Sequence, residues 1–216
     1  MSRVRVKVCG ITSIKDLLIA VDAGVDAVGF VVNVPQSPRN LSINETKKLI
    51  KSTPIFVETV VVTVPKHLSH LKKISQEFSS SIIQVHGLSH LHKEIREELP
   101  DARIIASIQA TPHFDTTVAV EAAEMFEAVL LDSYVSGKHG GTGIANDWEL
   151  GRRVREAIHP KPLILAGGLT PENVKQTINI VKPYAVDVSS GVESRLGIKD
   201  RNKIYEFVKN TKEVDI

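Results

Sequence analysis

The sequence contains very little cysteine, since Cys9 is the only thiol among 216 residues. One cysteine cannot form an internal disulfide. Without a cysteine pair or a close His/Cys cluster, a structural zinc site has nothing to start from. We therefore expect neither a disulfide nor a bound metal, and the thiol must serve either packing or chemistry.

An excess of charge of one sign is also absent. The chain has 27 Lys and Arg residues against 25 Asp and Glu residues, a formal charge of +2, and the basic residues are scattered along it. Proteins that bind nucleic acid usually collect basic residues into a patch or stripe. Nucleic acid is therefore not an expected partner.

Long apolar runs are lacking as well. Residues 1–10 alternate charged with apolar side chains, so the apolar core of a secretory signal is missing. The 42% hydrophobic and 24% charged fractions are ordinary for a soluble globular protein. No composition shift divides the chain, so we predict one cytoplasmic domain over residues 1–216, with no membrane segment.

Short runs rich in Val and Ile alternate with longer amphipathic stretches along the whole chain. This alternation is typical of β/α units that build a parallel sheet, and eight such units predict a closed (β/α)8 TIM barrel. The predicted strands are residues 4–9, 26–32, 55–64, 81–85, 103–108, 128–132, 162–166 and 185–189. The predicted helices are residues 13–23, 44–51, 66–78, 91–99, 118–126, 147–157, 171–181 and 201–212.

Capping residues mark several of these helices. We expect Ser13 to precede the first, Asn44 and Thr46 to open the second, residues 170–172 to start the seventh, and Gly24 to end the first. The rival architecture is an open doubly wound sheet, which usually carries phosphate-binding glycines directly after its first strand. Here the glycine-rich segments come late in the chain instead.

Three late segments have the composition of phosphate-binding loops. Glycine lets backbone N–H groups approach an anion closely, and serine or threonine hydroxyls donate further hydrogen bonds. In TIM barrels phosphate is commonly held after strands seven and eight. The predicted phosphate-binding residues are Gly141, Thr142 and Gly143 after strand six, Gly167 and Gly168 after strand seven, and Ser189, Ser190 and Gly191 after strand eight.

Two candidate catalytic groups end predicted strands, where barrel enzymes place their active sites. Cys9 ends the first strand, and Lys7, two residues earlier, projects toward the same face, where a cation would favour the thiolate. Asp132 closes the apolar sixth strand, where partial desolvation would raise its pKa and suit it to a general acid. A buried packing thiol and a loop-capping carboxylate are the simpler alternatives.

Two further side chains are predicted to line the same mouth. Arg39 follows the second strand, and its guanidinium is suited to clamp a carboxylate through two parallel hydrogen bonds. His86 directly follows the fourth strand and is expected to support the site by hydrogen bonding rather than to catalyse.

Taken in order, these motifs resemble the phosphoribosylanthranilate isomerases, the barrel enzymes of tryptophan biosynthesis, over nearly the whole chain. The motifs are KVCGIT at 7–12, DAVGF at 26–30, SPR at 37–39, QVHG at 84–87, LLD at 130–132, GGTG at 140–143, LAGGL at 165–169 and VDVSSGVE at 186–193. Each motif is weak alone, and their order is specific.

The resemblance implies an Amadori rearrangement of N-(5-phosphoribosyl)anthranilate to 1-(2-carboxyphenylamino)-1-deoxyribulose 5-phosphate, without cofactor or metal. It implies that Asp132 is the general acid, that Cys9 is the general base and that Arg39 holds the anthranilate carboxylate. Lys7, His86 and Asp187 would support the site. The expected partner is a phosphorylated small molecule, and the expected state is a monomer or homodimer.

Two other functions remain open at this point. Another isomerase or lyase, such as a sugar-phosphate epimerase, would share the phosphate loops, because barrels reuse them across many chemistries. A metal-dependent epimerase, however, needs His and carboxylate ligands at strand ends, and no such set can be assembled from the sequence. A non-catalytic phosphometabolite-binding protein would need neither Cys9 nor Asp132.

Overall fold

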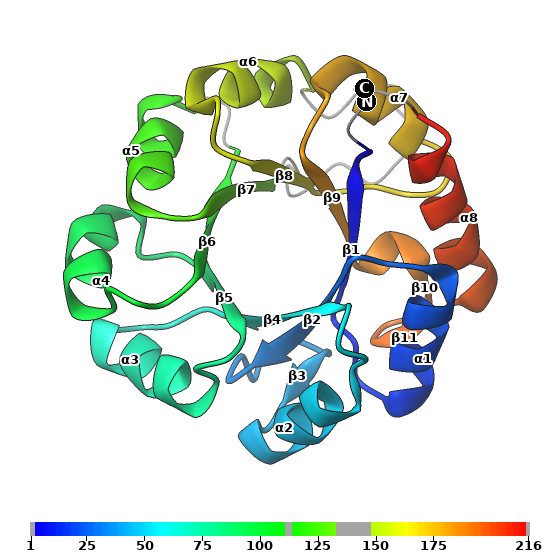
Figure 1. Cartoon of the computed structure of the whole chain (residues 1–216), viewed down its shortest axis with the longest axis horizontal. Helices are drawn as coiled ribbons and strands as arrows, with labels where there is room; N and C mark the ends of the chain where they lie inside the picture. The colour runs from blue at the N-terminus through cyan, green and yellow to red at the C-terminus, as the bar shows by residue number, and fades with distance from the viewer. Residues whose placement is uncertain (1–2, 111–113, 133–147, 215–216) are drawn as a thin grey trace.

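The structure is a computed structural model that describes residues 3–110, 114–132 and 148–214. Its parallel strands form a ring in the order β1-β9-β8-β7-β6-β5-β4-β2, which the pairing of β1 with β2 closes, and helices surround the ring (Figure 1). The predicted (β/α)8 barrel is therefore confirmed, and the open doubly wound alternative is excluded.

The barrel elements lie within a few residues of their predicted positions. The strands are β1 (Arg5–Cys9), β2 (Ala27–Val32), β4 (Glu58–Thr63), β5 (Ile82–His86), β6 (Ile104–Gln109), β7 (Ala128–Asp132), β8 (Leu163–Ala166) and β9 (Ala185–Val188). The helices are α1 (Ile14–Ala23), α2 (Ile43–Ser52), α3 (Leu68–Glu77), α4 (His92–Glu98), α5 (Thr117–Met125), α6 (Trp148–Ile158), α7 (Val174–Val181) and α8 (Arg201–Lys212).

The predicted ends of α1 agree with the structure, whereas the predicted starts of α2 and α7 do not. Ser13 caps α1 by accepting a hydrogen bond from the Asp16 N–H, and Gly24 ends α1 at a φ of 84°. Helix α2 begins one residue earlier than predicted, because Ser42, two residues before Asn44, caps it and forms a reciprocal capping box with Glu45.

The seventh helix was placed too early. Residues 171–173 form turns, and α7 begins at Val174. Asn173 explains the delay, because its side-chain Oδ1 accepts the Thr170 N–H at 2.8 Å while its Nδ2 donates to the Gly168 carbonyl at 2.9 Å. Thr170 and Asn173 therefore stabilise a turn between the β8 loop and the helix.

Apolar side chains fill the barrel interior below its mouth. Because successive strand residues point to opposite faces, one set of side chains faces the barrel axis and the other faces the helices. The interior cluster includes Val60, Val62, Ile105, Leu130 and Ile164, all at most 6% exposed. This rigid floor positions the polar side chains that end the strands above it.

Three short strands were not predicted. β3 (Asn40–Leu41) pairs with β2, directly after the loop that carries Arg39. β10 (Glu193–Arg195) and β11 (Ile198–Lys199) form an antiparallel hairpin between β9 and α8. Within the described ranges, no helix is long and apolar enough to cross a membrane.

Candidate active site

A cavity of about 630 Å³ opens at the carboxyl ends of the barrel strands. It brings together residues from β1, the loop after β2, β5, β7, β8 and the loop after β9. The predicted site residues that line it are Cys9, Arg39, His86, Asp132, Gly167, Gly168, Asp187, Ser189, Ser190 and Gly191. Lys7 lies deeper in the barrel, and Gly141, Thr142 and Gly143 fall outside the described residues.

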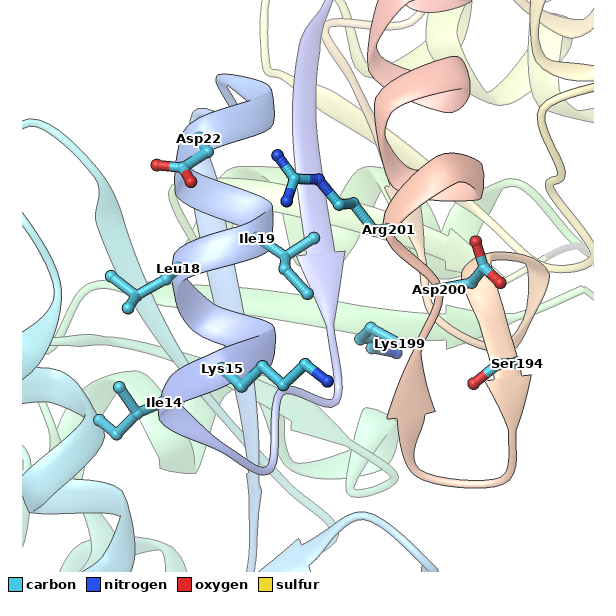
Figure 2. Close-up of a pocket in the computed structure, with 9 residues that line it drawn as sticks. All are labelled: Ile14, Lys15, Leu18, Ile19, Asp22, Ser194, Lys199, Asp200 and Arg201. Carbon is cyan, nitrogen blue, oxygen red and sulfur yellow. The ribbon is translucent and has the colours of Figure 1, made fainter.

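A second cavity, of about 690 Å³, lies outside the barrel between α1 and the segment that joins the hairpin to α8 (Figure 2). Its walls include Lys15 and Asp22 of α1 and Asp200 and Arg201 of the start of α8. None of the predicted site residues lines it. The mouth of the barrel is therefore the candidate active site.

Cys9 ends β1 and is 8% exposed. Gly29 lies beside it on β2, where a Cβ would come within 2.9 Å of the Cys9 Sγ and 3.2 Å of the Lys7 Nζ. Burial raises the pKa of the Cys9 thiol, and the Lys7 ammonium offsets only part of this effect. The Lys7 cation therefore acts on the pKa of Cys9 in the expected direction, but desolvation outweighs it.

Lys7 and Asp187 form an ion pair beneath the cavity. The Lys7 Nζ donates to the Asp187 Oδ1 at 3.0 Å, and the two side chains are only 4% and 7% exposed. Burial opposes the charged ammonium, but Asp187 and Cys9 together raise the pKa of Lys7 above its usual value. A persistent positive charge therefore lies close to the thiol.

Asp132 is the last residue of β7 and is partly buried. Its backbone carbonyl accepts the Ala110 N–H at 2.9 Å, and the strand is paired on both sides, with β6 and β8. In the ring, β7 is separated from β1 by β8 and β9. The carboxylate and the thiol thus line the same cavity from different sides of the barrel.

His86 is held by hydrogen bonds on both ring nitrogens. The Gln84 Nε2 lies 2.8 Å from the His86 Nε2, and the Ser107 Oγ lies 3.0 Å from the His86 Nδ1. Burial, with a smaller effect of the Lys7 charge, lowers the pKa of His86 to about 4. His86 is therefore neutral near neutral pH and can present a fixed tautomer to the cavity.

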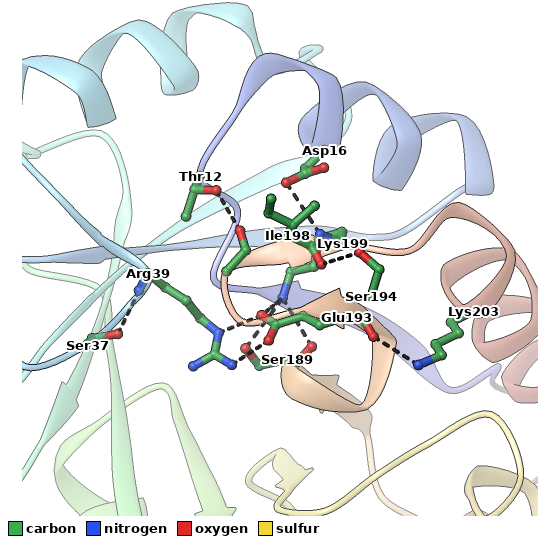
Figure 3. Close-up of polar contacts among 11 residues, drawn as sticks. Thr12, Asp16, Ser37, Arg39, Ser189, Glu193, Ser194, Ile198, Lys199 and Lys203 are labelled. Carbon is green, nitrogen blue, oxygen red and sulfur yellow. Dashed lines mark hydrogen bonds and ion pairs between the residues drawn. The ribbon is translucent and has the colours of Figure 1, made fainter.

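Arg39 already binds a carboxylate of the protein itself. Its Nε and Nη2 donate to the two carboxylate oxygens of Glu193 at 2.6 and 2.7 Å (Figure 3). Lys199 donates to the same carboxylate at 3.0 Å and to the Ser189 carbonyl at 3.1 Å. Glu193 and Lys199 were not predicted as site residues, because the sequence does not show that residues 193–199 fold into a hairpin that buries these two side chains.

The loops after β8 and β9 approach each other closely. Gly167 and Gly168 adopt φ values of 92° and 63°, which side chains rarely tolerate. A Cβ on Gly191 would lie 1.9 Å from the Leu169 carbonyl oxygen, so no side chain fits there. Glycine is thus required on both loops for the backbones to come together at the rim of the cavity.

No group of three or more His, Cys, Asp or Glu side chains able to hold a metal ion occurs in the part of the chain that the structure describes. The fold and its polar cavity at the strand ends define a (β/α)8-barrel enzyme. A sequence profile of the family described as N-(5'phosphoribosyl)anthranilate (PRA) isomerase matches residues 6–210. The chain belongs to this family of isomerases of tryptophan biosynthesis.

Individual relatives agree with this assignment. N-(5'-phosphoribosyl)anthranilate isomerase from Methanothrix thermoacetophila is 43% identical over 210 residues, which cover 96% of this chain and 98% of the relative. The crystal structure of phosphoribosyl anthranilate isomerase from Thermotoga maritima is 36% identical with a TM-score of 0.83, covering 98% of this chain and 100% of that one.

A second solved structure is a phosphoribosyl anthranilate isomerase in complex with reduced 1-(o-carboxyphenylamino)-1-deoxyribulose 5-phosphate. It is 35% identical, covers 98% of this chain and 100% of that one, and superposes with a TM-score of 0.80. The prediction of the family from the sequence motifs is therefore confirmed.

Proposed function

We propose that residues 1–216 act as one domain that converts N-(5-phosphoribosyl)anthranilate to 1-(2-carboxyphenylamino)-1-deoxyribulose 5-phosphate by an Amadori rearrangement. The protein is then an aldose-ketose isomerase that needs no cofactor. The observation that carries the proposal is that a thiol, a carboxylate and an arginine line one cavity of about 630 Å³. This volume is within the usual range for small-molecule sites.

In the first step, Asp132 acts as the general acid. Its protonated carboxyl transfers a proton to the ribose ring oxygen, the bond from C1 to that oxygen breaks, and the ring opens to a protonated Schiff base. Asp132 ends β7 at the edge of the cavity, partly shielded from solvent, which suits a group that must reach the substrate and hold a proton.

In the second step, Cys9 acts as the general base. The iminium acidifies the C2 proton, so a thiolate is a strong enough base to remove it, and the resulting enolamine tautomerises to the ketose. Because burial raises the pKa of Cys9, the thiolate depends on the Lys7 ammonium for electrostatic stabilisation. Lys7 in turn is held in place by Asp187.

The two ends of the substrate are held by different anion-binding groups. Arg39 binds the anthranilate carboxylate, and the backbone N–H groups and hydroxyls of residues 167–168 and 189–191, with 141–143, bind the phosphate. Anchors at both ends fix the reacting carbons between acid and base, so that binding energy far from the chemistry contributes to orientation.

We expect the purified protein to consume N-(5-phosphoribosyl)anthranilate, seen as loss of its anthranilate fluorescence, at the same rate before and after exhaustive treatment with a chelator. The rate should not change because proton transfers by Asp132 and Cys9 need no metal. Activity lost on chelation and restored by a divalent metal would contradict the cofactor-independent mechanism. Absence of turnover before chelation would contradict the proposed reaction itself.

Replacing Lys7 with Met is expected to shift the acidic limb of the kcat/KM profile to higher pH. The base works as a thiolate, so activity rises as the pH passes the pKa of Cys9. Removal of the cation that lowers this pKa moves the rise upward. A thermal melt checks folding, and K72M, which removes an exposed lysine far from the site, is the control. An unchanged midpoint in K7M would argue against this role of Lys7.

A further inference from the structure

Within the proposed function, on which this inference rests, we propose that Glu193 is a positioning residue for substrate binding. It holds one edge of the Arg39 guanidinium, formed by Nε and Nη2, so that the adjacent edge, formed by Nη1 and Nη2, takes the carboxylate of the substrate. Arg39 lines the cavity and Glu193 does not. The arginine therefore lies between the protein's own carboxylate and the space in which the substrate binds.

The hydrogen bonds of the pair leave the second edge available. A guanidinium has five N–H donors in a planar fork. Glu193 takes the Nε–H and one Nη2–H of Arg39, at 2.6 and 2.7 Å, and no other described residue accepts a hydrogen bond from this guanidinium. The remaining donors include a parallel pair on Nη1 and Nη2, which matches the two oxygens of a carboxylate.

The charges around Glu193 favour an additional anion. The carboxylate of Glu193 is 4% exposed and contacts two cations, Arg39 and the Lys199 ammonium, whose side chain is fully buried. One negative charge against two positive charges leaves this cluster with a surplus of +1. A bound substrate carboxylate would neutralise that surplus in a partly desolvated place, where charge compensation is most effective.

Glu193 is itself fixed from several sides. Its backbone carbonyl accepts a hydrogen bond from the Lys203 Nζ at 2.9 Å, and its side chain accepts one from Lys199 at 3.0 Å. Lys199 also donates to the carbonyl of Ser189, which starts one of the proposed phosphate-binding segments. The hairpin thus links the group that orients Arg39 to the loop after β9 (Figure 3).

Two glycines, one directly after β1 and one in the hairpin, let the backbone come close to the loop that carries Arg39. Gly10 has a φ of 75°, and a Cβ there would lie 2.3 Å from the Arg39 Cδ. A Cβ on Gly197, at the tip of the hairpin, would lie 3.0 Å from the Pro38 carbonyl oxygen, and the Gly197 carbonyl accepts the Thr12 hydroxyl at 2.8 Å. These contacts fix the path of the Arg39 side chain as well as its end.

The test is a double-mutant cycle between Glu193 and Arg39, measured as KM and kcat for N-(5-phosphoribosyl)anthranilate. E193Q keeps the shape of the side chain but turns one acceptor into an N–H donor that faces the guanidinium. We expect its KM to rise about 10-fold with kcat changed little, and R39A to raise KM about 10- to 100-fold. E193D keeps the charge and should lie between wild type and E193Q.

The decisive comparison is the effect of E193Q in the R39A background. If Glu193 acts through Arg39, E193Q changes KM there by less than about twofold, whereas a merely structural role raises KM by the same factor in both backgrounds. E127Q, which alters the remote pair of Glu127 with Arg96, is the matched control and should leave KM unchanged. Thermal unfolding of each variant checks that it folds, and E193D replaces E193Q in the cycle if E193Q does not.

The outcomes distinguish the proposed role of Arg39 from the proposed role of Glu193. An unchanged KM in R39A would overturn the proposed role of Arg39 and this inference with it. A raised KM in R39A, together with an E193Q effect that is absent or equal in both backgrounds, would overturn the positioning role of Glu193 alone.

Discussion

Replacing Asp132 with Asn is expected to lower kcat by about 10²- to 10⁴-fold, the usual contribution of a positioned general acid or base. Asparagine keeps the size of the side chain but has no acidic proton to give to the ribose ring oxygen. The cavity stays intact, because β7 is fixed through backbone pairing with β6 and β8. KM should therefore change little.

The rate is followed through the loss of anthranilate fluorescence, under saturating substrate. Titration with reduced 1-(2-carboxyphenylamino)-1-deoxyribulose 5-phosphate, called the reduced product below, shows whether the pocket of D132N is intact. Wild-type kcat in this variant would reject Asp132 as the acid. A loss of activity that comes only from weaker binding would reassign Asp132 to substrate affinity.

The second large effect is expected for Cys9→Ser, which should also lower kcat by about 10²- to 10⁴-fold. A serine hydroxyl fits the same space, but it releases its proton far less readily than a thiol and so cannot supply the base. In wild type, Lys7 favours the thiolate against the burial that opposes it. In C9S the same ammonium has no anion to stabilise.

The kcat of C9S is measured in the same assay. C9A, which removes the acid-base group altogether, is the matched variant. If the thiol is the base, C9S and C9A should be about equally slow, because neither carries a usable base. A C9S enzyme with wild-type kcat would mean that Cys9 only packs, which its 8% exposure would also permit.

The barrel was predictable because its signals are local and repeated. Each buried strand is a short run of Val, Ile and Leu, and each intervening helix has an amphipathic pattern, so eight repeats specify a parallel ring. Helix ends were less predictable. At Ser42 and Asn173 a side chain settles the boundary through a specific hydrogen bond, and several nearby polar residues compete for that position.

The general location of the site was also predictable, since strand ends in a barrel all reach one face. Cys9, Asp132 and Arg39 could be selected on that ground. The environment of each was not predictable, because it depends on residues far away in sequence. Arg39 contacts Glu193 from 154 positions later, and the burial that raises the pKa of Cys9 comes from the whole ring.

The hairpin of β10 and β11 shows the same limit. Residues 193–199 contain three charged side chains that look like ordinary surface residues in the sequence, yet two of them, Glu193 and Lys199, are buried. Only the folded chain shows that Lys199 and Arg39 both donate hydrogen bonds to the Glu193 carboxylate. The phosphate-binding role of the glycine and serine segments remains a prediction.

The two-group mechanism is tested most directly by comparing wild type, Cys9→Ser and Asp132→Asn side by side in the fluorescence assay. Affinity for the reduced product is measured in parallel. We expect rapid turnover by wild type, loss of at least about 100-fold in kcat in each variant, and nearly unchanged affinity for the reduced product. Wild-type kcat in either variant would contradict the assignment of that residue and with it the two-group mechanism.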